Sequence, residues 1–299
     1  MCIRDSDDNT YLVSSCGKDD TVIDGSGTGD VIDFTWNNNG SVVDGFSITN
    51  GISGVHLHGA QATISNSSIY GNSNSAANGG GVNADHGNDF LTLVNSEVFN
   101  NSAINGAGLA FNQGNFVIID STIRNNTATG DGGGLWLNGL AGKTNSITGS
   151  TFTLNSSGDT GGGLHLTNGT GIVNIDKSII STNSSGTRGG GIYKENSIRA
   201  AVANSIISDN GSGTEGGAIA SVGNSIGSFS LINTTLAGND ATTYGGAIYT
   251  YNGDYNPCNF TIRNSVFWNN VAAGAGFPGH NICLLYTSPS PRDRTRSRM

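Results

Sequence analysis

The chain has 299 residues and a formal net charge of -9, with only 12% charged and 35% hydrophobic residues. The acidic balance argues against a nucleic-acid partner, and no apolar run reaches transmembrane length. Recurrent Val, Ile and Leu at low charge argue against a disordered chain, although 35% is low for an ordinary globular core.

The two ends of the chain resemble translated library DNA rather than protein. The first six residues read MCIRDS, and residues 283–288 read CLLYTS. The reverse complement of one back-translation of MCIRDS encodes Cys-Leu-Leu-Tyr-Thr, as expected of the inverted transposon ends used in tagmentation. We therefore expect residues 1–6 and 283–299 to be adapter-derived, and residues 7–282 to be one domain truncated at both ends. A signal peptide would then not be observable.

A glycine-rich motif recurs along the chain. Two early segments, TVIDGSGTG (residues 21–29) and SVVDGFSITNG (residues 41–51), precede it. The motif is a triplet of mostly Gly followed by an aliphatic residue, at steps of 26 to 29 residues. The aliphatic positions are Val82, Leu109, Leu135, Leu164, Ile192, Ile219 and Ile248, with weaker copies ending at Val55 and Phe277. A period near 28 residues predicts a repeat architecture.

Two further columns run between the glycine motifs. The apolar column is Ile69, Val98, Ile123, Phe152, Ile179, Ile207, Leu236 and Phe267. The polar column, three residues later, is Asn72, Asn101, Asn126, Asn155, Thr182, Asn210, Asn239 and Asn270. A second apolar column runs Ile64, Leu93, Ile118, Ile147, Val202, Leu231 and Ile262, with Asn174 as an exception. We expect the Asn residues to form a structural amide ladder at a corner, where Asn tolerates positive φ.

Apolar and polar residues alternate within each motif, which is the two-residue period of strands. The repeat is too short for a strand, a crossover helix and a second strand. It predicts an all-β fold, a right-handed parallel β-helix solenoid of about ten rungs stacked at about 4.8 Å. The Gly triplets would form the tight corners.

These repeats resemble the right-handed parallel β-helices of the pectate-lyase-like superfamily. The GGAI units and segments such as Val98-Phe99-Asn100-Asn101 also resemble repeats of polymorphic outer-membrane proteins, a family of surface adhesins. The resemblance implies a secreted or cell-surface location, a bacterial outer-membrane passenger among the options. It implies a polysaccharide or cell-surface glycan as partner. Enzymes of the superfamily act on acidic polysaccharides in a groove along one sheet, and the lyases use Ca²⁺ with an Arg or Lys base.

Scarce charges gather at one edge of the predicted solenoid. The position before the Gly triplet holds Asp131, Arg188 and Glu215, and Asp159 lies one residue before it in its own repeat. Rungs about 5 Å apart would let Arg188 pair with Glu215. These four residues are the candidates for catalysis or Ca²⁺ binding. The alternative is a solvated ion pair that stabilises little.

An outward position follows each Gly motif, and on three consecutive rungs it holds Trp136, His165 and Tyr193. Exposed rings in a row could stack on sugar rings, so we predict a ligand-binding role for them. The alternative is that they only stack on each other across strands.

His56 and His58 share a face two residues apart, but no further ligand is placed with them, so we predict a surface pair and no metal site.

Two functions remain open from the sequence. The first is a secreted or surface β-helix without catalysis, an adhesin or glycan-binding passenger, with no cofactor. The second is a polysaccharide lyase or glycoside hydrolase, with Ca²⁺ if it is a lyase. Degenerate repeats with few charges favour the first, and the charged edge beside the aromatic column favours the second. In both, the intact protein is expected to be a monomer with no nucleic-acid partner and no membrane span in this fragment.

Overall fold

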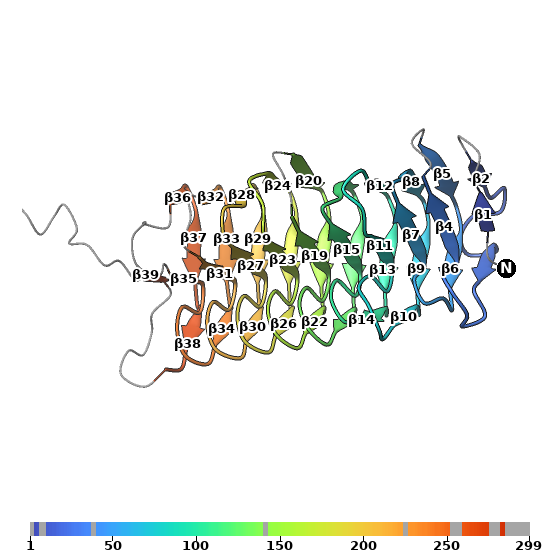
Figure 1. Ribbon diagram of the computed structural model, residues 1–299. Coiled ribbons are helices and arrows are strands. Elements are labelled where there is room, and N and C mark those ends of the chain that lie inside the picture. Colours follow the sequence, from blue (N-terminus) through green and yellow to red (C-terminus); the bar gives the residue numbers. More distant parts are fainter. Residues whose placement is uncertain are drawn as a thin grey trace, which may run out of the picture.

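A computed structural model describes residues 3–5, 10–36, 40–139, 143–223, 227–251, 259–274 and 282–284. These residues form a rod of parallel strands with no helix among them (Figure 1). The rod has about nine turns, roughly 28 residues apart. The predicted all-β parallel solenoid is confirmed, with slightly fewer turns than expected.

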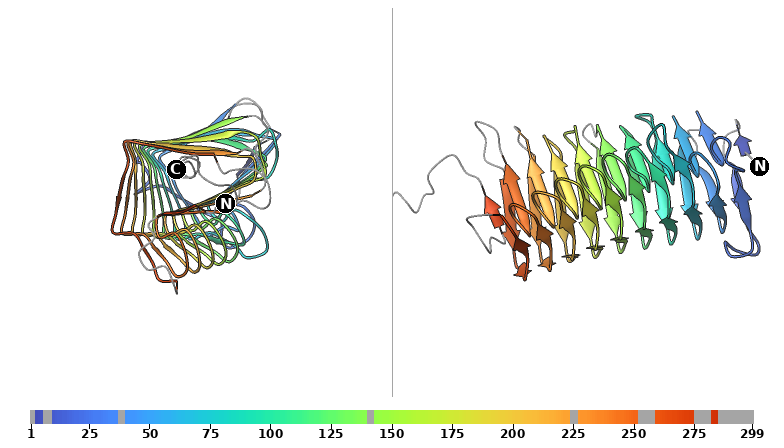
Figure 2. Two further views of the ribbon diagram at one scale, coloured as in Figure 1. Left: turned by 90° about the vertical axis from the view of Figure 1, so that its left-hand side faces the viewer. Right: turned by 90° about the horizontal axis from the view of Figure 1, so that it is seen from below.

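From β7 (Val55–His58) to β38 (Val271–Ala272), each turn contributes one strand to each of four parallel sheets. Among the described residues, the turns before β7 have no strand in the fourth sheet. A representative turn runs through β7 (Val55–His58), β8 (Gln61–Ser65), β9 (Ser68–Tyr70) and β10 (Ser73–Asn74) before β11 (Val82–Ala84) begins the next turn. We call the sheets that contain these first four strands A, B, C and D. Seen along the axis, the turns overlie one another, and the loops beside the short sheet D strands project to one side (Figure 2, left).

The sheets hold eleven, ten, ten and eight strands. Sheet A comprises β1 (Ile3–Asp5), β4 (Ile32–Thr35), β7, β11, β15 (Leu109–Asn112), β19 (Leu135–Asn138), β23 (Leu164–Thr167), β27 (Ile192–Glu195), β31 (Ile219–Val222), β35 (Ile248–Tyr251) and β39 (Ile282–Leu284). Sheet B comprises β2 (Tyr11–Val13), β5 (Ser41–Asp44), β8, β12 (Phe90–Val94), β16 (Asn115–Ile119), β20 (Thr144–Thr148), β24 (Ile172–Asp176), β28 (Arg199–Ala203), β32 (Ser228–Ile232) and β36 (Asn259–Arg263). Sheet C comprises β3 (Val22–Asp24), β6 (Ser47–Thr49), β9, β13 (Glu97–Phe99), β17 (Thr122–Arg124), β21 (Thr151–Thr153), β25 (Ile179–Ser181), β29 (Ile206–Ser208), β33 (Thr235–Ala237) and β37 (Val266–Trp268). Sheet D comprises β10, β14 (Ser102–Ala103), β18 (Thr127–Ala128), β22 (Ser156–Ser157), β26 (Ser184–Ser185), β30 (Gly211–Ser212), β34 (Asp240–Ala241) and β38 (Val271–Ala272).

The ends of sheet A fall in or beside the segments that resemble adapter sequence. Strand β1 pairs with β4, and β39 pairs with β35. The weak Gly motif that ends at Phe277 lies outside the described residues. No helix in the described part is long and apolar enough to cross a bilayer.

The interior is one continuous column of buried aliphatic and aromatic side chains. Leu135, Leu164 and Ile192 pair in register and are fully buried. Large rings such as Phe111 and Phe116 fill the space between the sheets, with ring centroids 4.7 Å apart. Each turn therefore buries only a thin strip of apolar residues, which explains the low apolar fraction of the sequence.

One turn departs from the predicted columns by a single residue. Phe152 pairs with Ile180, not with Ile179, and Ile147 pairs with Ile175, not with Asn174. The assignment of Thr182 to the Asn column is also wrong, because Asn183 holds that place. With a period of two, a slip of one residue exchanges the inner and outer faces. The buried Ile180 and the exposed Ile179 show which register the structure takes.

The Gly triplets form the corner that leads into sheet A. The first Gly of each triplet has positive φ, for example +67° at Gly161, and a Cβ there would lie 2.5 Å from the Leu164 carbonyl oxygen. The third Gly of this triplet, Gly163, faces the next turn, where a Cβ would lie 2.6 Å from the Gly191 carbonyl oxygen. The first position requires Gly for its backbone angle as well as for close approach. The third position is only tight, because Ala218 and Ala247 take it in later turns and are fully buried there.

The Asn column forms a buried side-chain amide ladder between sheets C and D. Nδ2 of Asn155 donates to Oδ1 of Asn183 at 3.0 Å and to the Ile123 carbonyl at 2.9 Å. Its Oδ1 accepts hydrogen bonds from the backbone N–H and the Nδ2 of Asn126. The positive φ at this corner belongs to the preceding residue, Leu154 at 57°, rather than to the ladder residue itself.

Replacing one ladder amide should destabilise the rod. Asn155→Ala removes the acceptor of the Asn126 backbone N–H and Nδ2, and the donor to Oδ1 of Asn183 and to the Ile123 carbonyl. Each buried group that is left unpaired costs about 1–3 kcal/mol. We expect the urea midpoint to fall by the equivalent of about 3 kcal/mol or more. The control is Asn138→Ala, which removes two amide bonds nearer the surface, a part-buried one to Asn112 and an exposed one from Asn168. Because water can replace these bonds, the loss should be about 1 kcal/mol or less. Equal losses in the two variants would contradict the role of the ladder.

Candidate functional site

A cavity lies where the loops after sheet D meet the outer face of sheet A. Its volume is about 380 Å³. The lining residues are Asp131, Asp159, Thr160, His165, Thr187, Arg188, Tyr193, Glu195 and Thr214. The loops of four consecutive turns supply the residues before the Gly triplets, and β23 and β27 supply His165, Tyr193 and Glu195. Side-chain alternation explains this, because Leu164 and Ile192 point into the core and their successors point outward.

The charged edge predicted from the sequence lies at this cavity. Asp131, Asp159 and Arg188 line it, while Glu215 lies beside Arg188 and forms an ion pair with its Nε. Thr160, Arg188, Glu215 and Tyr244 pair as successive parallel bridges, so the residues before the triplets stack in register. The Asp159 carboxylate accepts a hydrogen bond of 2.6 Å from the Thr187 hydroxyl on the next turn.

Three side chains form a directed hydrogen-bond chain at one end of the cavity. The Thr160 hydroxyl donates to Oδ1 of Asp131 at 2.6 Å, and its oxygen lies 2.7 Å from Nδ1 of His165. Since the only hydroxyl proton goes to the carboxylate, Nδ1 of His165 must be the donor to Thr160. His165 therefore carries its proton on Nδ1 and leaves Nε2 as an acceptor.

His165 is held in its neutral form. Burial lowers the pKa of His165 below its usual value of 6.5, outweighing the opposite pull of Asp131, Glu195 and Asp159. The neighbouring Tyr193 is also largely enclosed, and burial raises the pKa of its hydroxyl to about 12. With both rings neutral, the fixed charges of the cavity lining are three carboxylates and Arg188.

The three rings predicted for sugar stacking do not form an open platform. His165 and Tyr193 are only 5% and 6% exposed, and their rings stack on each other with centroids 5.0 Å apart. The prediction of a solvent-exposed row is therefore wrong for these two. Trp136 pairs with His165 from the adjacent strand and is partly exposed. Its role in binding a ligand stays a prediction.

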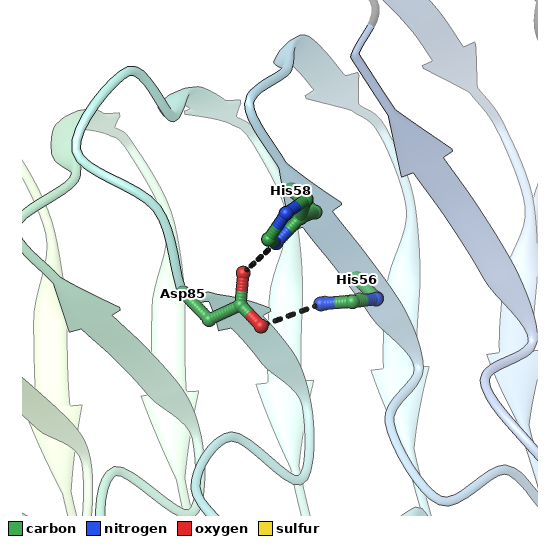
Figure 3. A group of neighbouring side chains, drawn as sticks. All are labelled: His56, His58 and Asp85. Carbon is green, nitrogen blue, oxygen red and sulfur yellow. Dashed lines mark hydrogen bonds and ion pairs between the residues drawn. The ribbon is translucent and has the colours of Figure 1, made fainter.

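A second cluster lies on the same outer face of sheet A, nearer the N-terminus. His56 and His58 project from β7, and Asp85 follows β11 on the next turn (Figure 3). Nδ1 of His58 lies 2.6 Å from Oδ1 of Asp85, and Nε2 of His56 lies 3.2 Å from Oδ2. Burial pushes the pKa of Asp85 upward, but the hydrogen bonds and charges of His58 and His56 outweigh it, so this pKa lies below its usual value.

The expectation that no third ligand joins the two His residues is wrong. The three side chains place one ligand atom each within 4.8 Å of one another, and no other such group of three is found among the described residues. Sequence reasoning missed Asp85 because it follows the strand rather than lying within it. Asp85 comes three residues after Val82, just as His58 comes three residues after Val55, and Val82 pairs with Val55. This equal spacing is the signal that could have placed Asp85 beside His58.

Comparisons of the chain with protein-family models, with curated proteins and with solved structures find no match.

The neutral state of His165 should make stability depend on pH. Below the ordinary pKa of 6.5 the unfolded chain takes up a proton at this position, and the folded chain does not until the pH reaches the lower folded value. Stability is therefore full above this window and falls as the pH drops from neutral toward about 5. In the variant His165→Asn, the side-chain amide places an N–H donor near the position of Nδ1, but the amide does not titrate. Its urea midpoint should fall less than that of the wild type over this range, and parallel curves would contradict the assignment.

Proposed function

We propose that this protein is a secreted or cell-surface β-helix of the pectate-lyase-like kind that binds a glycan chain along the outer face of sheet A without cleaving it. The observation that carries the proposal is the cavity beside β23 and β27. Its polar groups come from consecutive turns, so they repeat at about 4.8 Å along the rod. That spacing is comparable with the length of one sugar unit in an extended chain.

The chemistry of the lining suits sugar hydroxyls. Each hydroxyl both donates and accepts a hydrogen bond. The carboxylates of Asp159 and Glu195 can accept, and the guanidinium of Arg188 can donate. The Thr214 hydroxyl donates its proton to the Thr187 carbonyl, so its oxygen can accept from a ligand. Oε2 of Glu195 is already positioned by the Thr167 hydroxyl at 3.0 Å. Such preorganised groups reduce the ordering that binding would otherwise require.

The charge of the cavity favours a neutral or amino-sugar glycan over a polyuronate. Three carboxylates line it, and its one cation, Arg188, is already neutralised by Glu215. The whole chain is also negative, at -9. An acidic polysaccharide would meet like charges in the site, which costs binding energy.

The same geometry is a poor match for lyase or hydrolase chemistry. A lyase base must be able to lose its proton, and the hydrogen bond with Glu215 raises the pKa of Arg188 further above its usual value. Thr160 donates to a carboxylate rather than to a histidine base, so it is not activated as a nucleophile. In the described chain, the cavity carboxylates do not converge as the ligand atoms of His56, His58 and Asp85 do.

The test is glycan-array binding with neutral, amino-sugar and uronate ligands, followed by titration of the best ligand. Asp159→Ala removes a lining carboxylate and Trp136→Ala removes the partly exposed ring beside His165, and each should weaken binding about 10-fold. The matched control is Trp268→Ala, because Trp268 is 72% exposed on sheet C, away from the cavity. It should bind like the wild type.

Two results would overturn the proposal. Equal loss of binding in all three variants would show that the glycan does not use this cavity. Release of shortened or unsaturated sugars from a uronate polysaccharide, abolished by Arg188→Ala, would instead establish the lyase alternative.

A further inference from the structure

His56 and His58 have the placement of a metal-ligand pair. They are two residues apart on β7, so both side chains leave the same face of sheet A. Asp85 reaches them from the end of the next strand, as Figure 3 shows. The three residues therefore come from two adjacent turns and converge from two directions.

The distances suit a small ion. Zn²⁺ binds His nitrogen and carboxylate oxygen at about 2.0–2.2 Å, so two of its ligand atoms lie about 3.4 Å apart in a tetrahedral site. The Asp85 oxygens lie 2.6 Å and 3.2 Å from Nδ1 of His58 and Nε2 of His56, and all three ligand atoms lie within 4.8 Å of one another. Shifts of side-chain rotamers are enough to open this cluster around an ion.

The second nitrogen of His56 is supported by carboxylates. Nδ1 of His56 lies 3.3 Å from Oδ1 of Asp33 and 3.4 Å from Oδ2 of Asp30. The carboxylate of Asp33 accepts from the Thr35 hydroxyl, and that of Asp30 accepts from the Ser53 backbone N–H. A ligating His commonly donates its other ring N–H to a carboxylate, which fixes the tautomer and directs the free nitrogen at the metal.

The platform beneath the cluster is rigid. Strand β7 is paired on both sides, with β4 and β11. The His58 ring packs edge-on against Trp36 at 4.9 Å and lies 5.3 Å from the His86 ring. The buried Asp89 holds the loop that carries Asp85, because its carboxylate accepts from the backbone N–H groups of Ala60 and His86.

We propose that His56, His58 and Asp85 bind a divalent first-row transition ion, with Zn²⁺ as the reference case. Two imidazoles and one carboxylate suit borderline ions of this class better than Ca²⁺ or Mg²⁺, which prefer oxygen. The side chains of His56, His58 and Asp85 are 19%, 35% and 39% exposed, so solvent reaches the ion and its remaining positions are open to water or a ligand. The ion also links two turns of the rod.

The test is calorimetric titration of the tag-free full chain with Zn²⁺, with Co²⁺ absorption as an independent report of nitrogen and oxygen ligation. We expect one saturable site per chain. Asp85→Asn and His58→Ala should each weaken binding at least 10-fold, and Asp33→Asn should weaken it about 10-fold through the tautomer of His56. The matched control is His165→Asn, which replaces an imidazole on β23, four strand steps from His56 and outside the ligand set, and should keep the affinity.

Circular dichroism shows whether each variant keeps its strands, and Asp85→Asn is nearly isosteric. Absence of a saturable site in the wild type would overturn the proposal. So would unchanged affinity in both Asp85→Asn and His58→Ala, or an equal loss in His165→Asn, because the ligand set would then be different. The metal proposal and the glycan proposal can fail separately, because the histidine cluster and the cavity lie at different places on the rod.

Discussion

The structure depends on in-register stacking of parallel turns. Each strand residue lies about 4.8 Å from the residues at the same position in the turns above and below. Each such column must therefore hold residues whose side chains can pack or hydrogen-bond against others of the same kind. Aliphatic side chains meet this condition by packing and Asn side chains by donating along the ladder, as Asn126 does to Asn155 at 3.0 Å. Gly meets it by having no side chain, since a Cβ on Gly163 would lie 2.6 Å from the next turn's backbone.

The same constraint positions the functional groups. The outward column of sheet A runs through His56, Trp136 and His165, and four strand steps separate His56 from His165. At about 4.8 Å a step, the histidine cluster and the cavity lie about 19 Å apart on one face. The inward columns must repeat the same kind of residue to fill the core, whereas the outward columns are free to vary. The candidate functional groups lie in the outward columns.

Interior columns can vary too, at a cost that the structure offsets locally. Lys194 follows Leu137 and Leu166 in an inward column of sheet A and is only 3% exposed. Its Nζ donates to the carbonyls of Asn196 at 2.8 Å and Gly227 at 3.2 Å. A buried ammonium is tolerated only with such partners. Its neighbour Glu195 points outward and lines the cavity, so one strand serves both faces.

The sequence by itself determined the fold class, the repeat length, the Gly corner, the Asn ladder and the register of the charged edge. These features repeat, and a repeated column is visible without knowing what surrounds it. Single turns were less certain, because in a segment such as Ser178-Ile179-Ile180 either Ile can be the inward residue, and only packing decides that Ile180 is buried. Tertiary structure also decided that His165 and Tyr193 lie beneath the loops after sheet D, and that Asp85 joins His56 and His58. Loops between strands carry no period, so the side chains they bring to a face cannot be read from the pattern that predicts the strands.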